Sequence, residues 1–444
     1  MSTLPVYNSP RWSIRSESVT HLAIGWVLML PLIFFAVHGN FSFQNAGNNN
    51  TLGGTALAGL ASSGRSLGFV GYVITPGIAY SIVLWLIYTN FSRIAAQALQ
   101  MRVVTLLALL TICSALWSQN PFRSFYNGVF YLIDTLFAFY LIETFDTNDL
   151  IDLAKMAGAF ICIGSLVLVV FYPQIGVLQQ LRESGAWRGL FIDRTSAAKC
   201  MVFMLSPAII FVRQPLSLSR VVYILLLGCF IFMAHAVTAL LVLFIYVLIM
   251  AAIAAFRKFD DKSLLLLTGL SVTLLVLVVS ASLPLLPSFL SLFSRNTTLS
   301  GRTYVWAIVI RSIMKRPILG YGFYAFWQGM TGESANTIVA VNWTFGYAHN
   351  GILELMLQLG LLGTTVFFVT LVQALRNAWI CLRNGRPSAA DWYVGLIVLT
   401  ILYNVDEATV VWPNELLSIL YVVACCGLAR SAGHFKRSRA LETA

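Results

Sequence analysis

The sequence has little charge for its length. Only 10% of its 444 residues are Asp, Glu, Lys or Arg, and 59% are hydrophobic, whereas a typical soluble domain is roughly 25% charged. A chain of this size with so few charges has too little polar surface to face water on all sides. We therefore predict an all-α, polytopic membrane protein, folded as a single transmembrane domain over residues 1–444.

Several motifs of soluble enzymes are missing. The chain has no P-loop, no G-x-G-x-x-G and no H-E-x-x-H, so nothing indicates nucleotide or zinc chemistry. The seven cysteines show neither metal-ligand spacing nor a disulfide framework. No D-x-D arrangement is available to hold a metal–diphosphate complex. We expect no metal and no cofactor.

Positive charge is in excess but dispersed. The net charge is +11, yet the basic residues stand between apolar stretches instead of gathering on one domain. Nucleic acid is therefore not expected as a partner. Anionic lipid headgroups or a phosphorylated lipid substrate fit this distribution better.

Twelve apolar stretches are long enough to cross a hydrocarbon core of about 30 Å. The run 220–256 is too long for one helix, and we place a break at "AHAVT", where His235 and Thr238 suit a tight hairpin. The predicted spans lie near 20–38, 68–89, 102–118, 125–145, 151–172, 197–213, 220–235, 237–256, 263–283, 348–374, 391–404 and 411–430.

The basic residues orient these spans. With both termini on the cytoplasmic side, most basic residues fall on the inner face, as the positive-inside rule requires. The remaining ones gather mainly in two outer loops, one near 182–199 and a large periplasmic loop at 284–347. This concentration predicts that an anion binds at the periplasmic face, where we expect the active site.

The first outer cluster is "ESGAWRGLFIDRTSAAKC" at 183–200. Trp187 and Phe191 suit the membrane interface, and Arg188 and Arg194 would lie beside them. A guanidinium offers a planar fork that matches two phosphate oxygens. The alternative is that both arginines are interfacial anchors whose side chains extend to the headgroups.

The second cluster is "GRTYVWAIVIRSIMKRPILGYG" at 301–322, which predicts a helix at the bilayer surface that begins near Arg302 and ends before Pro317. Arg302 would add its charge to a helix N-terminus, a position that attracts phosphate. The other basic side chains suit anchoring to headgroups: Arg311, Lys315 and Arg316.

The third group is "YAHNGILELMLQLGLLG" at 347–363. His349 and Asn350 stand at the outer mouth of a spanning helix, where a histidine can accept a proton near neutral pH; the alternative is a structural hydrogen bond. Glu354 lies in the membrane, where ionisable groups are costly and usually functional. Glu407, in the outer loop "YNVDEATVVWPNELL", is a candidate partner for the arginines or for sugar hydroxyls.

These stretches resemble the O-antigen ligase and polysaccharide polymerase superfamily. "SGRTYVWAIVIRSIMKRPILGYGFYAFW" (300–327) is similar to its outer-loop signature, and "AHNGILELMLQLGLLG" (348–363) to its His-Asn helix. "WRGLF" (187–191) resembles the arginine motif of the exopolysaccharide polymerase branch, and "NVDEATVVW" is more loosely similar to a Glu-containing segment. The resemblance extends from about residue 185 to 430.

The resemblance implies a membrane glycosyltransferase (GT-C-like) bundle with its large outer loop between helices 9 and 10. It also implies a metal-independent, inverting transfer from a saccharide on a polyprenyl diphosphate such as undecaprenyl diphosphate to a glycan acceptor. On this basis Arg188, Arg302 and Arg194 are expected to bind the diphosphate, and His349 to activate the acceptor hydroxyl. Asn350, Glu354 and Glu407 are further candidates for substrate binding.

Three functions remain open. Polymerisation of an exopolysaccharide is favoured by "WRGLF", with a flippase and a chain-length regulator as candidate partners. The second is a ligase that moves the glycan to a lipid A core or a protein. The third, from a different class, is a saccharide transporter or flippase. Many transporters have discontinuous helices and internal repeats, and neither is evident in the sequence.

Overall fold

A computed structural model describes residues 14–37, 74–179, 185–210, 217–256, 302–341, 346–384 and 389–443. Within these ranges the chain is helical and forms no strand; Val177 and Trp187 make one isolated β-bridge. The predicted all-α membrane class is therefore confirmed.

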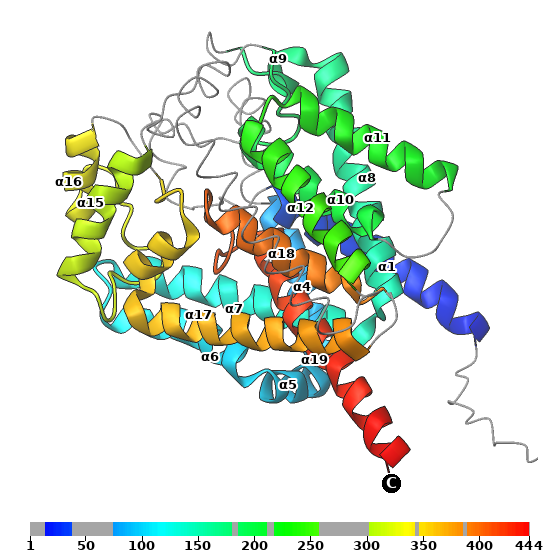
Figure 1. The fold of residues 1–444 in the computed structure, drawn as a ribbon. Helices are drawn as coiled ribbons and strands as arrows, with labels where there is room; N and C mark the ends of the chain where they lie inside the picture. Colours follow the sequence, from blue (N-terminus) through cyan, green and yellow to red (C-terminus); the bar gives the residue numbers. More distant parts are fainter. Residues whose placement is uncertain are drawn as a thin grey trace, which may run out of the picture.

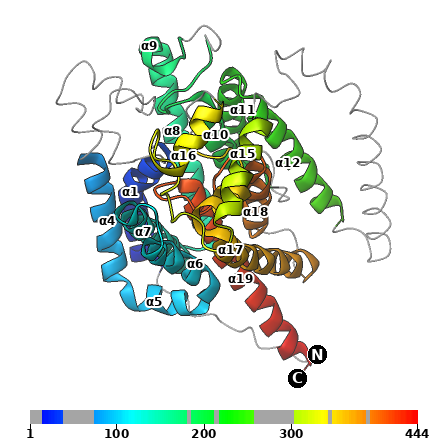
Figure 2. The same cartoon turned by 90° about the vertical axis from the view of Figure 1, so that its left-hand side faces the viewer.

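Most helices gather into one bundle, and two shorter ones stand beside it (Figure 1). Figure 2 shows this pair, α15 and α16, in front of the bundle, with α1, α4 and α7 on one side and α11, α12 and α18 on the other. The helices are α1 (Ile14–Val37), α4 (Thr75–Thr89), α5 (Phe91–Gln100), α6 (Arg102–Cys113), α7 (Pro121–Thr144), α8 (Thr147–Phe171), α9 (Pro173–Gly176), α10 (Arg194–Ile209), α11 (Leu218–Met233), α12 (Val237–Phe256), α15 (Arg302–Lys315), α16 (Gly332–Val341), α17 (Gly351–Asn384), α18 (Asp391–Asn404) and α19 (Leu416–Thr443).

Each predicted span except 263–283, which lies outside the described residues, coincides with one of these helices. The break expected within 220–256 is confirmed, because α11 ends at Met233, α12 begins at Val237 and His235 has a φ of 51°. Five described helices are long and apolar enough to cross a membrane: α7, α8, α12, α17 and α19. A sixth crossing arises if α4 and α5, which meet at a bend of 84°, form one span. The count of twelve stays a prediction.

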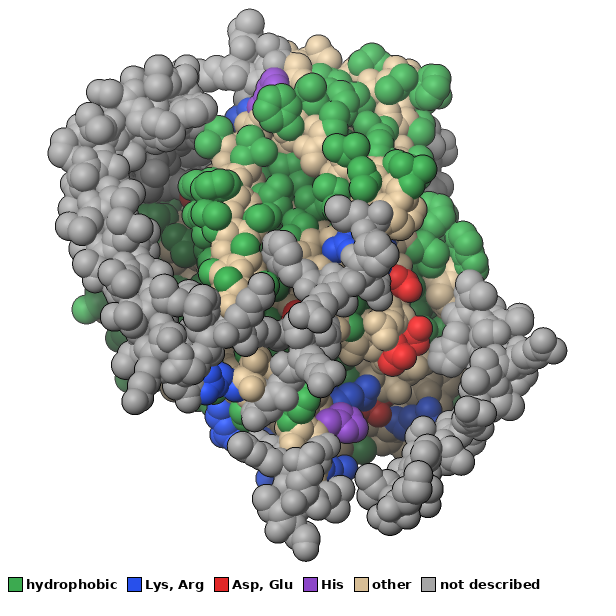
Figure 3. All heavy atoms as spheres, turned by 45° about the vertical axis from the view of Figure 1, so that its right-hand side comes forward, with side chains coloured by type: hydrophobic (Ala, Val, Ile, Leu, Met, Phe, Trp, Pro, Cys, Tyr) green, Lys and Arg blue, Asp and Glu red, His purple; other side chains and the backbone are tan. Residues whose placement is uncertain are grey.

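The outer surface and the core both follow from a membrane environment. Large apolar side chains of α11 and α12, such as Phe232 and Phe244, are more than half exposed. Figure 3 shows one face on which hydrophobic side chains spread over the upper part and most charged ones gather below. By contrast, α18 and the first half of α19 are buried on nearly all sides, as expected for helices that are apolar around their whole circumference.

The helix α17 is discontinuous, which was not apparent from the sequence. Gly360 interrupts it with a φ of 61° and a ψ of −161°. The loop after α15 docks into this break, and Gly320 passes so close that an added Cβ would lie 2.6 Å from the Leu357 carbonyl oxygen. Four backbone hydrogen bonds join the two segments: Leu361 and Leu362 donate to Pro317 and Ile318, at 2.8 and 3.1 Å, and Tyr321 and Gly322 donate to Leu357 and Gln358, at 2.8 and 2.9 Å.

The helix α15 lies within the predicted outer loop, and one of its faces packs on protein. Its apolar side chains Val305, Val309 and Ile313 are buried in a small core of their own with Tyr321, Phe326 and Trp327. Two of its expected headgroup anchors also contact protein: Lys315 Nζ pairs with Glu333 at 2.5 Å, and the Arg316 guanidinium lies 5.2 Å from the centre of the Tyr321 ring. The placement of α15 at the bilayer surface stays a prediction. Arg311 is exposed.

Candidate functional site

His349 lies in the short segment immediately before α17, with a φ of 51°. Its neighbour Ala348 is completely buried, and both the N–H and the carbonyl of Ala348 are hydrogen-bonded. The Trp306 indole donates to the Ala348 carbonyl at 3.0 Å, and the Ala348 N–H donates to Glu354 Oε2 at 2.7 Å. The position of His349 is thus set by the first turns of α15 and of α17 together.

Glu354 lies beneath this segment, and its carboxylate is fully engaged. The residue is 2% exposed, and it also accepts hydrogen bonds from the Trp327 indole and from Gln358 Nε2. A buried carboxylate is tolerated when donors of this kind surround it. In this arrangement Glu354 supports the backbone before His349.

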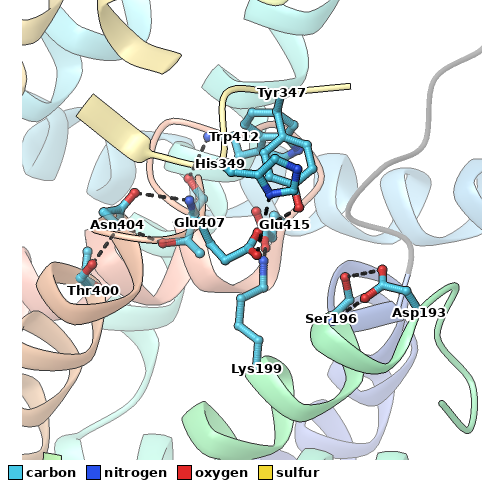
Figure 4. Close-up of polar contacts among 12 residues, drawn as sticks. Asp193, Ser196, Lys199, Tyr347, His349, Thr400, Asn404, Glu407, Trp412 and Glu415 are labelled. Atoms are coloured by element: carbon cyan, nitrogen blue, oxygen red, sulfur yellow. Dashed lines mark hydrogen bonds and ion pairs between the residues drawn. The ribbon is translucent and has the colours of Figure 1, made fainter. Parts of the chain in front are cut away.

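The imidazole of His349 faces a carboxylate from another part of the chain. Glu407 lies in the loop between α18 and α19, and its Oε1 is 3.8 Å from His349 Nδ1. Tyr347 donates its hydroxyl to Glu407 Oε2 at 2.8 Å, and its ring centre is 4.1 Å from that of the imidazole. Figure 4 shows these three side chains gathered at the start of α17.

The environment of Glu407 favours its charged form. Only 3% of the residue is exposed, and burial by itself raises the pKa of a carboxyl group. The neighbouring His349 side chain, the positive charge of Lys199 and the Tyr347 hydroxyl together outweigh burial and lower the Glu407 pKa to about 2. Glu407 is therefore a carboxylate throughout the physiological pH range.

A buried ion pair lies below Glu407. Lys199 extends from α10, and its Nζ is 3.1 Å from Oε1 of Glu415 at the start of α19 (Figure 4). Burial raises the pKa of Glu415, and the charge of Lys199 opposes that increase. One ammonium group thus faces two carboxylates, which leaves the group negative before His349 is counted. From the sequence, Glu415 was considered, with Asp406 and Glu407, as a partner for the arginines or for sugar hydroxyls, whereas Lys199 was counted only among the outer basic residues.

The loop before α10 contains the predicted arginines. Arg188 Nε donates to the Ile175 carbonyl at 2.7 Å, and its Nη1 donates to the Ile192 carbonyl at 3.2 Å. Burial lowers the Arg188 pKa, and the nearby charge of Asp193 opposes this. Asp193 also caps α10 through its hydrogen bonds to Ser196, at 2.8 Å from each carboxylate oxygen. Arg188 therefore shapes the loop with two of its nitrogens, and Nη2 has no hydrogen bond among the described residues.

The remaining candidates occupy helix starts. Arg194 and Arg302 are the first residues of α10 and α15; the side chain of Arg302 lies outside the described residues. Asn350 caps α17, because its Oδ1 accepts from the N–H groups of Ile352 and Leu353. Its Nδ2 donates to the Val405 carbonyl at 3.0 Å. The structure thus brings His349, Asn350, Glu354 and Glu407 together. Their part in substrate binding stays a prediction.

No group of three or more His, Cys, Asp or Glu side chains within the described ranges is arranged to hold a metal ion. The described side chains offer a histidine beside an ionised carboxylate, and the Trp306–Ala348 hydrogen bond joins this segment to α15, which begins at Arg302. Such a histidine can accept a proton, and a helix N-terminus that carries an arginine can attract an anion.

The fold and this group define a multi-pass membrane protein whose ionisable residues converge at helix ends. Comparisons with known proteins place it further. Residues 222–368, about a third of the chain, match the O-antigen ligase family model. The match includes Arg302, His349 and Glu354 but ends before Glu407.

Two curated proteins are also similar to this chain. The exopolysaccharide production protein ExoQ of Rhizobium meliloti (strain 1021) is 24% identical over 313 residues, which cover 66% of this chain and 69% of that protein. A protein of Rickettsia prowazekii (strain Madrid E), named "Putative polysaccharide ligase RP358", is 27% identical over 128 residues, covering 27% of this chain and 32% of its own. Part of the chain therefore matches the O-antigen ligase family model, and the chain is similar to these two proteins, which confirms the resemblance found in the sequence.

Proposed function

We propose that this protein is a membrane glycosyltransferase that polymerises saccharide repeat units carried on a lipid diphosphate into an exopolysaccharide. The observation that carries this proposal is His349 held beside the ionised carboxylate of Glu407, at the start of α17 and next to loops rich in arginine. The reaction takes place at the outer face of the bacterial inner membrane, where those loops are predicted to lie. The O-antigen ligase match supports the enzyme class.

The reaction is a single displacement. The acceptor hydroxyl oxygen attacks the anomeric carbon of the donor sugar, and the bond from that carbon to the diphosphate oxygen breaks. The electron pair leaves with the lipid diphosphate, and the hydroxyl proton passes to Nε2 of His349. Attack from the side opposite the leaving group inverts the configuration at the anomeric carbon. The products are a glycan longer by one repeat unit and a free lipid diphosphate.

In this proposal Glu407 assists His349 in two ways. A carboxylate facing Nδ1 favours the tautomer that carries its proton there, so Nε2 keeps a lone pair for the acceptor proton. The same negative charge stabilises the imidazolium that forms when the proton arrives. Tyr347, which donates to the second oxygen of Glu407, fixes the carboxylate against the ring.

Positive charge is needed where the leaving group departs. Arg302 at the start of α15 combines its own charge with the N-terminal amides of that helix, which bind phosphate oxygens well. Arg188 and Arg194 supply a second positive region before α10. Stabilisation of the growing charge on the diphosphate by fixed cations is a large source of rate enhancement in such reactions, and it leaves no requirement for a metal ion.

Polymerisation is preferred over ligation because the similarity to ExoQ, a protein named for exopolysaccharide production, extends over two thirds of this chain. The ligase alternative, transfer of the glycan to a lipid A core or a protein, is favoured by the family description and by the name of the second relative. The two functions share the donor and the displacement step, and differ only in the acceptor. A flippase that delivers the donor and a regulator of chain length are expected partners.

The test uses purified full-length protein in lipid nanodiscs with a lipid-diphosphate repeat unit. We expect longer glycan and free lipid diphosphate, and we expect at least about 100-fold less of both with His349→Ala. Arg302→Ala should lose activity as well, whereas Arg311→Ala, on the exposed side of the same helix, should not. Transfer only to an added lipid A core would favour the ligase. Unchanged activity of His349→Ala would refute the assignment of the base, and lipid movement across liposomes without any glycan transfer would indicate a transporter.

A further inference from the structure

The first turns of α7 carry three buried polar atoms that have no hydrogen-bond partner among the residues that the structure describes: Arg123 Nε, Tyr126 Oη and Asn127 Oδ1. Residues three and four apart lie on the same face of a helix, so these atoms share one face of α7. Asn127 is 1% exposed, and its amide nitrogen is already used in a hydrogen bond to the Arg123 carbonyl at 2.8 Å. Since buried polar groups are nearly always paired, three unpaired atoms on one helix face suggest a ligand.

A row of aromatic rings connects this face of α7 with His349. The Arg123 guanidinium carbon lies 5.6 Å from the centre of the Tyr324 ring, and Tyr324 lies 4.9 Å from Trp412. Trp412 in turn lies 6.0 Å from Tyr347, whose ring is 4.1 Å from the imidazole of His349. We call Tyr324, Trp412 and Tyr347 the aromatic row. It begins beside the proposed base and ends at Arg123.

The end of this row beside Arg123 is held in an unusual backbone conformation. Tyr324 has a φ of 59°, which is uncommon for a residue with a bulky side chain and is often found at ligand sites. Its N–H is fixed by Gln358 Oε1 at 3.1 Å, and the preceding carbonyl of Phe323 accepts from Ser124 on α7 at 2.8 Å. The loop is therefore attached to both α17 and α7, and this attachment holds the Tyr324 ring between Trp412 and Arg123.

The three unpaired atoms on α7 differ in hydrogen-bonding character. Arg123 Nε can only donate, Asn127 Oδ1 can only accept, and the Tyr126 hydroxyl can do both. A phosphate or carboxylate anion would satisfy the donors but would leave Asn127 Oδ1 facing another acceptor. Sugar hydroxyl groups both donate and accept, so they match the whole set. Aromatic faces are electron-rich, and they suit the C–H groups of a sugar ring.

We infer that Arg123, Tyr126 and Asn127 form a sugar-binding subsite for the acceptor glycan, at the end of the aromatic row remote from His349. This inference rests on the proposed glycosyl transfer and names where the acceptor lies. The hydroxyl that reacts would be at His349, and a sugar further along the same glycan would bind against α7. The subsite recognises the neutral part of the glycan, and the diphosphate would be bound elsewhere, by the arginines of the other loops.

The decisive variant is Tyr126→Phe, because it removes a buried hydroxyl that has no partner in the protein. Such a change should leave the melting temperature the same or higher. The matched control is Tyr246→Phe on α12, which removes another buried hydroxyl without a partner, away from the aromatic row. The ligand is a lipid-free oligosaccharide fragment of the polysaccharide made by the native strain, and its Kd is measured by calorimetry in the nanodisc-bound full chain.

We expect Tyr126→Phe to weaken oligosaccharide binding by about 3- to 10-fold, the value of one hydrogen bond between neutral groups. Tyr246→Phe should bind as the wild type does, and a glycan-free lipid diphosphate should bind equally to all three proteins. Unchanged oligosaccharide binding by Tyr126→Phe would overturn the subsite. The activity of His349→Ala separates this inference from the proposed function. If Tyr126→Phe weakens oligosaccharide binding but His349→Ala is fully active, the subsite is supported and the assignment of His349 as the base is refuted.

Discussion

Replacing Glu407 with glutamine tests the central pair of the site. The pKa of Glu407 falls from its ordinary value of 4.5 to about 2, which corresponds to about 3 kcal/mol in favour of the charged form. His349, Lys199 and Tyr347 all contribute to this energy, so the contribution of His349 alone is smaller than about 3 kcal/mol. Loss of the whole energy from the transition state would lower turnover by about 150-fold, and loss of the His349 contribution alone would lower it by about 10- to 100-fold.

The expected result is therefore a kcat of Glu407→Gln lower by about 10- to 100-fold, with KM for the lipid-linked repeat unit changed less than about 3-fold. The measurement is steady-state release of lipid diphosphate. Glu143→Gln is the control, since it removes a carboxylate that pairs with Arg430 at 2.8 Å, away from His349. A Glu407→Gln protein that keeps wild-type turnover while His349→Ala is inactive would refute the role of Glu407.

The same pKa predicts how stability depends on pH. The Glu407 carboxylate stabilises the folded state because its pKa is lower in the folded chain than in the unfolded chain. This stabilisation is present above about pH 4.5 and is lost as the pH falls toward 2. In an unfolding experiment at different pH values, Glu407→Gln should lack this part of the acid dependence. Lys199→Met should destabilise the fold by about 3–5 kcal/mol because it leaves Glu415 buried without its cation, and thermal unfolding of the double variant with Glu415→Gln should recover most of the loss. Gly320→Ala should cost more than Gly329→Ala, by about 1–3 kcal/mol, since both have positive φ but only the first would meet backbone atoms of α17.

The sequence was sufficient for the class of fold and for the position of most helices. Long apolar runs and the scarcity of charge have a single explanation, a lipid environment, and the break at His235 follows from the length of the run around it. The discontinuity of α17 was not predictable in this way, because Gly360 stands in an apolar stretch that is compatible with a continuous helix. Its conformation depends on the loop containing Gly320, which supplies the missing hydrogen bonds from 40 residues earlier in the chain.

From the sequence, individual residues of the candidate site could be predicted, but contacts between residues from different parts of the chain could not. His349 stands out as a histidine at a helix mouth, and Glu407 as an acid in an outer loop, but the sequence does not show that the two side chains meet. Lys199 was counted among the outer basic residues, and its burial against Glu415 depends on the packing of α10 against the start of α19. The face of α7 was also missed, because Asn127 and Tyr126 are ordinary residues for a membrane helix and become informative only when their partners are known.

The two strongest sequence motifs, at 300–327 and 348–363, are held together by hydrogen bonds. Trp306, one turn after Arg302 on the same face of α15, donates to the carbonyl of the residue before His349. The loop that ends α15 fills the break at Gly360, so the outer segment of α17 is positioned by that loop separately from the rest of the helix. Gly320 and Gly322 in this loop are therefore required for close packing, because an added Cβ would meet Leu357 and Ser118. The consequence is that the start of α15, where the leaving group would be stabilised, and His349, where the proton would be accepted, keep a fixed separation. A displacement reaction needs that geometry, because the attacking and departing oxygens must lie on opposite sides of one carbon.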